Sequence, residues 1–237
     1  MIELFDRLLS RLHSFRDSLV RYKIKQRLRR GTTNQSPKVQ DLDIYWDQGF
    51  VNSLETWGEK TVWLEIQFLL ANLQGRVLDI ACGTGRAIWL LRKFDALDVY
   101  GCDLSDLNIK RAAETGISLD RLRVCDATET PYPDDSFDYS YSIGSLEHFT
   151  EDGVSKFIKE TSRITRKNSF HQVPTSRSNE NEGWLQLDQS YFNNQVDWWL
   201  EKFAAVYDDV IVLDSSWQDP ISVGKWFVCR KDGLGRG

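Results

Sequence analysis

Short apolar runs alternate with longer amphipathic stretches along the chain from residue 61 onward. Short apolar runs are typical of buried parallel strands, and amphipathic stretches are typical of the helices that cover them. The amphipathic stretches predict helices over 61–73, 86–94, 105–115, 153–166 and 191–205. The apolar runs predict strands over 76–80, 97–102, 122–125, 136–143, 210–213 and 223–229. This alternation predicts a Rossmann-like α/β fold, with a mostly parallel sheet and helices on both faces.

Residues 2–29 show the apolar spacing of one long helix, in alternating steps of three and four residues. The first 30 residues hold nine Lys or Arg and three Asp or Glu, a net charge of +6. A basic amphipathic helix can lie on an anionic membrane surface, pair with another helix in an oligomer, or dock on its own domain. Residues 31–40 are polar and contain a proline, which predicts a linker before a domain over 41–232.

The body of the chain is acidic, with 21 Lys or Arg and 32 Asp or Glu after residue 30, a net charge of −11. This charge does not favour nucleic acid as a partner, because a grip on the phosphate backbone needs clustered positive charge. No run approaches the roughly 20 apolar residues of a membrane-spanning helix, and the first residues lack the apolar core of a signal peptide. The four cysteines have no CxxC spacing, which favours free thiols in a reducing cytoplasm.

The segment 76–86, Arg-Val-Leu-Asp-Ile-Ala-Cys-Gly-Thr-Gly-Arg, breaks from an apolar strand into a turn of small residues. Gly83 and Gly85 let the backbone turn tightly and approach a ligand without an intervening side chain. A strand, a small-residue turn and a helix open a doubly wound domain, whose ligand binds beyond the carboxyl ends of the strands. Asp79 would repel a pyrophosphate there and suits a cationic amino-acid ligand, so the pattern departs from the GxGxxG dinucleotide fingerprint.

Asp79-Ile-Ala-Cys-Gly-Thr-Gly85 resembles the first motif of class I S-adenosylmethionine-dependent methyltransferases. Val-Tyr-Gly-Cys-Asp-Leu-Ser over 99–105 resembles the second motif of that family. Asp126-Ala127 after the third strand and Pro-Tyr-Pro-Asp-Asp-Ser-Phe-Asp over 131–138 match the two motifs that follow. The matches lie in the family's order, and they imply S-adenosylmethionine as the cofactor and a seven-stranded sheet with a terminal antiparallel hairpin.

The resemblance also assigns residues to the cofactor. Asp103 stands about 20 residues beyond the Gly-rich turn, where a carboxylate can accept hydrogen bonds from both ribose hydroxyls. In the family, an acidic residue after the third strand accepts from the adenine amino group and the next backbone N–H reaches the ring, which Asp126 and Ala127 match. The implied cofactor-binding residues are Asp79, Ala81, Gly83, Gly85, Asp103, Leu104, Asp126, Ala127 and Ile143.

Two histidines are candidates for a general base, because imidazole titrates near neutral pH. His148 follows the fourth strand in Gly-Ser-Leu-Glu-His-Phe over 144–149, a segment that in the family lies between cofactor and acceptor. The alternative is that Glu147 and His148 only shape the pocket wall. His171 is expected near the carboxyl end of the fifth strand, and its alternative is a strand histidine satisfied by hydrogen bonds.

The sequence departs from the family at two places. Ubiquinone-pathway O-methyltransferases show a Glu-x-x-Glu-His motif that binds a divalent metal, and Gly144 replaces the first Glu here. No metal site is therefore predicted. The Pro-Gly-Gly turn that usually precedes the fifth strand is replaced by Arg-Lys-Asn-Ser-Phe over 166–170, which leaves the register of that strand open.

Aromatic residues before the first motif are candidates for the acceptor pocket, because this segment covers the cofactor in similar methyltransferases. Tyr45, Trp46 and Trp57 are the candidates there, and the alternative is that they only pack a helix onto the sheet. The polar stretch 175–188 is expected to form a mobile loop over the site, from which Trp184 could meet the acceptor.

These observations predict a S-adenosylmethionine-dependent methyltransferase that acts on a small-molecule or sugar acceptor, the sugar belonging to a glycan. O-methylation is favoured because a hydroxyl acceptor needs a general base and the sequence offers histidines for that role. The basic helix within residues 1–30 would let this cytoplasmic enzyme work at a membrane face. One alternative is an O-methyltransferase of quinone or polyketide type. The other is a non-catalytic adaptor that keeps the fold and binds a partner through residues 1–30.

Overall fold

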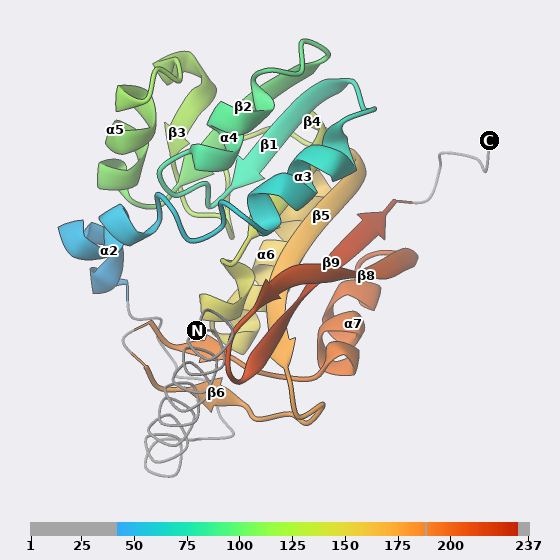
Figure 1. Ribbon diagram of the computed structural model, residues 1–237. Helices are drawn as coiled ribbons and strands as arrows, with labels where there is room; N and C mark the ends of the chain where they lie inside the picture. Colours follow the sequence, from blue (N-terminus) through green and yellow to red (C-terminus); the bar gives the residue numbers. More distant parts are fainter. Residues whose placement is uncertain (1–41, 188, 232–237) are drawn as a thin grey trace, which may run out of the picture.

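The computed structural model describes residues 42–187 and 189–231. The helix predicted at 1–30 and the linker predicted at 31–40 lie outside the described residues. The main sheet has seven strands in the order β3-β2-β1-β4-β5-β9-β8 (Figure 1). These strands are β1 (Gly75–Ile80), β2 (Leu97–Asp103), β3 (Leu122–Val124), β4 (Phe137–Ile143), β5 (Thr165–Ser176), β8 (Asp209–Gln218) and β9 (Ser222–Arg230).

Helices connect the strands, and a small two-stranded sheet joins them between β5 and α7. The α-helices are α2 (Gln48–Ser53), α3 (Val62–Leu70), α4 (Arg86–Leu91), α5 (Asp106–Glu114), α6 (Glu151–Ile164) and α7 (Val196–Ala204). The 3₁₀-helices are η1 (Asp43–Trp46), η2 (Leu119–Arg121) and η3 (Leu146–His148), and the small sheet pairs β6 (Trp184–Leu185) with β7 (Tyr191–Phe192).

The topology confirms the predicted doubly wound fold. β1 pairs in parallel with both β2 and β4, and the strand order reverses between these two neighbours. In open α/β sheets, a ligand crevice forms at such a reversal, outside the carboxyl ends of the strands. β9 runs antiparallel between β5 and β8, which confirms the predicted terminal hairpin.

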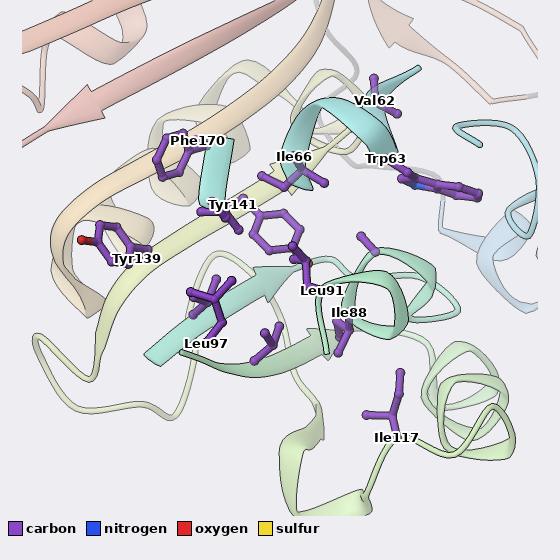
Figure 2. Close-up of a cluster of buried hydrophobic side chains, with 14 of the residues drawn as sticks. Val62, Trp63, Ile66, Ile88, Leu91, Leu97, Ile117, Tyr139, Tyr141 and Phe170 are labelled. Carbon is purple, nitrogen blue, oxygen red and sulfur yellow. The ribbon is translucent and has the colours of Figure 1, made fainter. Parts of the chain in front are cut away.

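Two apolar cores cover the two faces of the sheet, because alternate strand residues point to opposite faces. On one face, α3, α4 and α5 pack over a cluster that includes Val77, Val99 and Tyr141. Figure 2 shows side chains from α3, α4, β2, β4 and β5 converging in this cluster. On the other face, α6 and α7 pack over a cluster that includes Leu78 and Phe227. The sheet is therefore held rigidly between two layers of helices.

The structure differs from the predicted elements mainly after β4. Thr150 caps α6 through its side chain, so this helix begins at Glu151 and not at 153. The chain enters β5 directly at Thr165, and β5 then runs for 12 residues. His171 therefore lies in the middle of β5 and not near its carboxyl end. The stretch predicted as a mobile loop contributes to the β6–β7 hairpin, and the helix predicted to start at 191 begins at Val196.

Glu65 joins α3 to the terminal hairpin. Its carboxylate accepts hydrogen bonds from Ser215 Oγ at 2.7 Å, from Ser216 N at 2.6 Å and from Trp226 Nε1 at 2.7 Å. Burial opposes ionisation of this group, but the hydrogen bonds outweigh it and lower the pKa of Glu65. This contact connects the segment before β1 to β8 and β9, across 150 or more residues of sequence.

Candidate active site

A cavity of about 400 Å³ opens at the carboxyl ends of β1, β2 and β4, where the topology predicts a ligand. One end is lined by residues that follow β1, β2 and β3, and the other end by η3, the β6–β7 hairpin and the β8–β9 turn. Residues of the first group are assigned to the cofactor in the sequence analysis, and residues of the second group to the acceptor. The assigned residues that line the cavity are Tyr45, Trp57, Asp79, Ala81, Gly83, Asp103, Leu104, Asp126, Ala127, Ile143 and His148.

The Gly-rich turn after β1 has an unusual backbone. Ala81 and Gly83 both adopt the left-handed conformation, with φ of 59° and 53°. Non-glycine residues adopt this conformation rarely, and such strain is concentrated at functional sites. Asp79 lies just before the turn with 3% of its surface exposed, and burial raises its pKa well above the usual value. The strained turn places backbone groups at the cavity floor without long side chains over them.

Asp103 ends β2 and ties the Gly-rich turn to α5. Oδ2 accepts from Gly83 N at 2.8 Å, and Oδ1 accepts from Ser105 N at 2.9 Å and from Asn108 Nδ2 at 3.0 Å. Burial raises the pKa of Asp103, and these three hydrogen bonds act against that shift. A carboxylate has about four acceptor positions, so Asp103 keeps acceptor capacity on the cavity side. This capacity fits a ribose hydroxyl.

Asp126 and Ala127 follow β3 and line the same end of the cavity. Asp126 accepts hydrogen bonds from Thr128 N and Thr128 Oγ1, at 2.7 Å each, through Oδ1. Oδ2 can therefore accept a hydrogen bond from a ligand. Hydrogen-bond acceptors of this kind, carboxylates at the ends of β2 and β3 beside a strained Gly-rich turn, fit the ribose hydroxyls and the adenine amino group of S-adenosylmethionine.

Gly85 is assigned to the cofactor by the sequence, but it does not line the cavity. It precedes α4 with φ of 72°, and a Cβ there would lie 2.7 Å from Ile117 Cδ1 and 2.8 Å from Ala112 Cβ. A side chain would therefore overlap its neighbours and strain the backbone. Gly85 allows the turn and the close packing of α4, and it acts on the ligand only through that turn.

His148 lies in η3 at the acceptor end of the cavity and is 9% exposed. Its Nδ1 lies 2.8 Å from Ser190 O. A carbonyl oxygen can only accept, so Nδ1 carries the hydrogen and Nε2 keeps a free lone pair in the neutral ring. Burial lowers the pKa of His148 to about 4. The ring is therefore neutral at physiological pH, in the form that can accept a proton.

His171 has a different environment from the one predicted for it. Its side chain is fully buried, and it does not line the cavity. Nδ1 lies 2.8 Å from Ser142 Oγ, Nε2 lies 3.1 Å from Ser169 Oγ, and the ring stacks on Phe203 at 5.1 Å. Burial lowers the pKa of His171 to about 3. This geometry corresponds to the alternative given above, a strand histidine satisfied by hydrogen bonds.

Two of the predicted aromatic residues reach the cavity. Tyr45 lines it from η1, and Trp57 lines it from the segment before α3. Trp57 lies against Gly144, where a Cβ would be 3.0 Å from Trp57 Cη2 and the backbone φ is 60°. Position 144 therefore has no room for the glutamate of the metal-binding motif. Among residues 42–187 and 189–231, no three His, Cys, Asp or Glu side chains are grouped as metal ligands.

The other two aromatic candidates lie outside the cavity lining. Trp46 is 45% exposed and donates its indole hydrogen to Asp106 Oδ1 at 2.9 Å, which fastens η1 to α5. Trp184 is buried in β6 against Phe192, with ring centroids 4.9 Å apart. It belongs to the hairpin core, because β6 and β7 pack their aromatic side chains together.

Several lining residues have no assignment in the sequence analysis. They are Arg86, Glu147, Gln189, Tyr191, Trp217 and Asp219. Arg86 could have been found, because it directly follows the Gly-rich turn at the start of α4. Tyr191 in β7, Trp217 near the end of β8 and Asp219 in the β8–β9 turn carry no local motif, and only the fold brings them to the cavity.

Comparisons with known proteins agree with this geometry. A family model described as a methyltransferase domain matches residues 77–168, which hold β1 to β4 and α6. The chain is 33% identical over 128 residues to a ubiquinone/menaquinone biosynthesis C-methyltransferase of Rickettsia massiliae, across 49% of this chain and 50% of that protein. The chain thus spans about half the length of the Rickettsia relatives it matches.

Further similarities differ in the acceptor atom that their names give. The chain is 37% identical over 95 residues to a "probable tocopherol O-methyltransferase, chloroplastic" of Oryza sativa, across 37% of this chain and 25% of that protein. The Burkholderia thailandensis 1,6-didemethyltoxoflavin-N1-methyltransferase structure shares the fold with a TM-score of 0.61 and 16% identity, over 81% of this chain and 85% of that one. The motifs, the topology and the methyltransferase domain matched over residues 77–168 together support a class I S-adenosylmethionine-dependent methyltransferase, with S-adenosylmethionine as its cofactor.

Proposed function

We propose that this chain transfers a methyl group from S-adenosylmethionine to a hydroxyl group of a small-molecule or sugar acceptor. The observation that supports the proposal is one cavity lined by the carboxylates Asp103, at the end of β2, and Asp126, after β3, and by the neutral histidine His148 in η3. Methyl transfer needs the donor and acceptor aligned and water excluded, and one cavity lined by both groups of residues suits that requirement.

The chain's own residues would hold the cofactor at the ends of β1, β2 and β3. Asp103 accepts from the ribose hydroxyls, Asp126 from the adenine amino group, and the backbone of Ala81 to Gly83 lies beside the amino-acid part. When bound, S-adenosylmethionine supplies a methyl carbon that its sulfonium has already activated. The protein therefore has to orient the acceptor and remove its proton.

His148 is the group proposed to remove that proton. The hydrogen bond from Nδ1 to Ser190 O fixes the ring and leaves the Nε2 lone pair free to accept a proton from the acceptor hydroxyl. The edge-on contact with the Tyr191 ring, at 6.1 Å between centroids, holds the imidazole from a second side. A hydroxyl acceptor needs such a base, whereas a carbon or amine acceptor has a nucleophile of its own.

The acceptor end of the cavity is walled by aromatic rings, which suits a flat or ring-shaped acceptor. Tyr45, Trp57, Tyr191 and Trp217 contribute these rings from four separate segments. A ring of quinone type is the second candidate, because the Rickettsia relative is named for ubiquinone and menaquinone biosynthesis. Within the described chain, no helix is both long enough and apolar enough to cross a membrane.

The test begins with calorimetric titration of the full chain with S-adenosylhomocysteine. We expect micromolar binding, followed by transfer of labelled methyl groups in a screen of sugars, phenols, quinols and amines. A product whose labelled methyl group is bound to oxygen supports the proposal. Products whose labelled methyl group is bound only to carbon or nitrogen overturn O-methylation. Absence of S-adenosylhomocysteine binding would favour the non-catalytic adaptor.

A further inference from the structure

Glu147 is a buried carboxyl group at the acceptor end of the cavity that the proposed reaction does not use. It lies in η3 beside His148, lines the cavity and is 4% exposed. Its Oε2 atom has no hydrogen-bond partner among the described residues. A buried polar group without a partner costs about 1–3 kcal/mol, so its persistence at a cavity wall points to a ligand.

The surroundings of Glu147 keep it uncharged. Arg86, at the start of α4, is the cationic residue among the described lining residues, and no Lys accompanies it. Burial raises the pKa of Glu147 to about 8. The neutral carboxyl group can donate one hydrogen bond and also accept others, whereas an ionised carboxylate can only accept. Glu147 is therefore equipped to bind an uncharged polar group such as a hydroxyl.

The position of Glu147 relative to His148 defines a pair of adjacent binding atoms. Glu147 Oε1 and His148 Nε2 lie 3.6 Å apart, too far for a hydrogen bond between them. Both groups line the same cavity. Two hydroxyl groups on neighbouring carbons of a ring lie close enough together for each to reach one of these two groups at the same time.

We infer that the acceptor is a vicinal diol, with one hydroxyl bound at Nε2 of His148 and its neighbour bound by the carboxyl group of Glu147. The inference rests on the proposed function and narrows its substrate class. His148 accepts the proton of the hydroxyl that becomes methylated. Glu147 exchanges hydrogen bonds with the second hydroxyl, sets the orientation of the ring, and remains unchanged in the reaction.

The aromatic walls are consistent with this acceptor. Rings from Tyr45, Trp57, Tyr191 and Trp217 line the cavity near the pair, and they offer flat surfaces to a ring that carries the diol. Both a catechol and a sugar present adjacent hydroxyls on a ring. The shared chemistry is the diol, and the experiment distinguishes the two sources.

The test measures ligand binding to the full chain saturated with S-adenosylhomocysteine, by ligand-observed NMR. The probes are catechol against phenol and trans-cyclohexane-1,2-diol against cyclohexanol, with benzylamine as a cationic probe. We expect at least one diol to bind about tenfold more tightly than its monohydroxy partner, the scale of one hydrogen bond to a buried group. Preferential binding of catechol alone indicates an aromatic diol as the acceptor, and preferential binding of trans-cyclohexane-1,2-diol indicates a sugar.

Variants separate the role of Glu147 from folding. Glu147→Ala should remove the preference for the diol, whereas Glu147→Gln should keep it within about threefold, because a neutral amide also donates and accepts. Glu114→Ala, an exposed change on α5, is the matched control. Thermal unfolding and S-adenosylhomocysteine affinity are measured for each variant, and both should match the parent chain.

Three outcomes overturn the inference. The diols could bind no more tightly than their monohydroxy partners, or not at all, while S-adenosylhomocysteine still binds. This result overturns the assignment of a vicinal diol and leaves the methyltransferase proposal intact. Tight benzylamine binding that Glu147→Gln abolishes would show an ammonium acceptor paired with an ionised carboxylate. Failure of S-adenosylhomocysteine to bind the parent chain would overturn both proposals together.

Discussion

The two ends of the cavity are built in different ways. The cofactor end comes from three strand–turn segments within 79–127, where each residue follows its strand directly. The acceptor end comes from η1, the segment before α3, η3, the β6–β7 hairpin and the β8–β9 turn. Tyr45 and Asp219 meet at one cavity although 174 positions separate them in the sequence. One end is local in sequence, and the other depends on the whole fold.

This difference explains why relatives share a cofactor and differ in acceptor. The matched domain covers residues 77–168, which includes the cofactor end and stops before the hairpins. The relatives named above are a C-methyltransferase and a probable O-methyltransferase. Segments outside the shared domain can therefore change without disturbing Asp103 or the Gly-rich turn. Variants at the two ends should accordingly affect different steps.

The largest effect is expected at the acceptor end. His148→Ala should lower the turnover of the acceptor found in the screen by about 10²- to 10⁴-fold, the usual contribution of a general base. S-adenosylhomocysteine affinity should stay within about twofold, because the cofactor carboxylates are untouched. Rapid-mix methyl transfer and calorimetry measure the two quantities. A variant with unchanged turnover would show that His148 only shapes the wall.

His171 provides a second test of the role of His148, because both histidines are buried in the part of the chain that the structure describes. His171→Ala should lower the free energy of unfolding by about 1–3 kcal/mol, since two buried serine hydroxyls lose a partner. Turnover per folded molecule should not change. Chemical denaturation measures the first quantity, and loss of turnover in fully folded protein would instead assign His171 a catalytic role.

At the cofactor end, Asp103→Ala should weaken S-adenosylhomocysteine binding by about 1.5–3 kcal/mol, the scale for a charge-assisted hydrogen bond. The variant also releases Gly83 N and Asn108 from their acceptor. Asp98→Ala, in the same strand but paired with Arg121 at the surface, is the control and should bind normally. Calorimetry that finds equal affinity for both variants would contradict the ribose assignment.

The pH dependence of kcat/KM should report the acceptor end alone. Activity needs neutral His148, and burial lowers its pKa to about 4, so activity should be nearly constant from pH 5 to 7. It also needs protonated Glu147, whose pKa burial raises to about 8, so activity should fall as the pH rises through that value. The other titratable or charged residues that line the cavity are Tyr45, Asp79, Cys82, Arg86, Asp103, Asp126, Tyr191 and Asp219.

Glu147→Gln provides the control for the pH profile. It should remove the decline above pH 8, because an amide does not titrate there. If the activity of this variant still declines above pH 8, the decline is caused by the titration of another group.

The smallest effect on the site is expected from Glu65, which joins α3 to the terminal hairpin. Glu65→Gln should lower the free energy of unfolding by about 1–3 kcal/mol, the range for hydrogen bonds to a charged group. Because the folded state lowers the pKa of Glu65, this contribution is present above the unfolded pKa and is lost as the pH falls. Thermal melts of the variant and parent at pH 7 and pH 4 should therefore converge at the lower pH.

Much of the fold and the cofactor end could be predicted from local sequence. The apolar run before Asp79 and the small residues after it predict a strand and a turn, because burial and backbone freedom are properties of neighbouring residues. Asp103, Asp126 and Ala127 were assigned through the family resemblance, whose motifs are also short segments at or near strand ends. Gly85 was assigned to the ligand because local sequence does not show the Ile117 and Ala112 contacts that explain it.

The sequence by itself predicted the resemblance to methyltransferases, the α/β fold and the residues assigned to the cofactor, because each depends on short segments. Only the tertiary structure decided which histidine reaches the cavity, since His148 and His171 differ in burial and partners rather than in local pattern. It also decided that Trp57 reaches the acceptor end and Trp184 does not. The physical reason is that an acceptor wall assembled from distant segments exists only when the chain is folded.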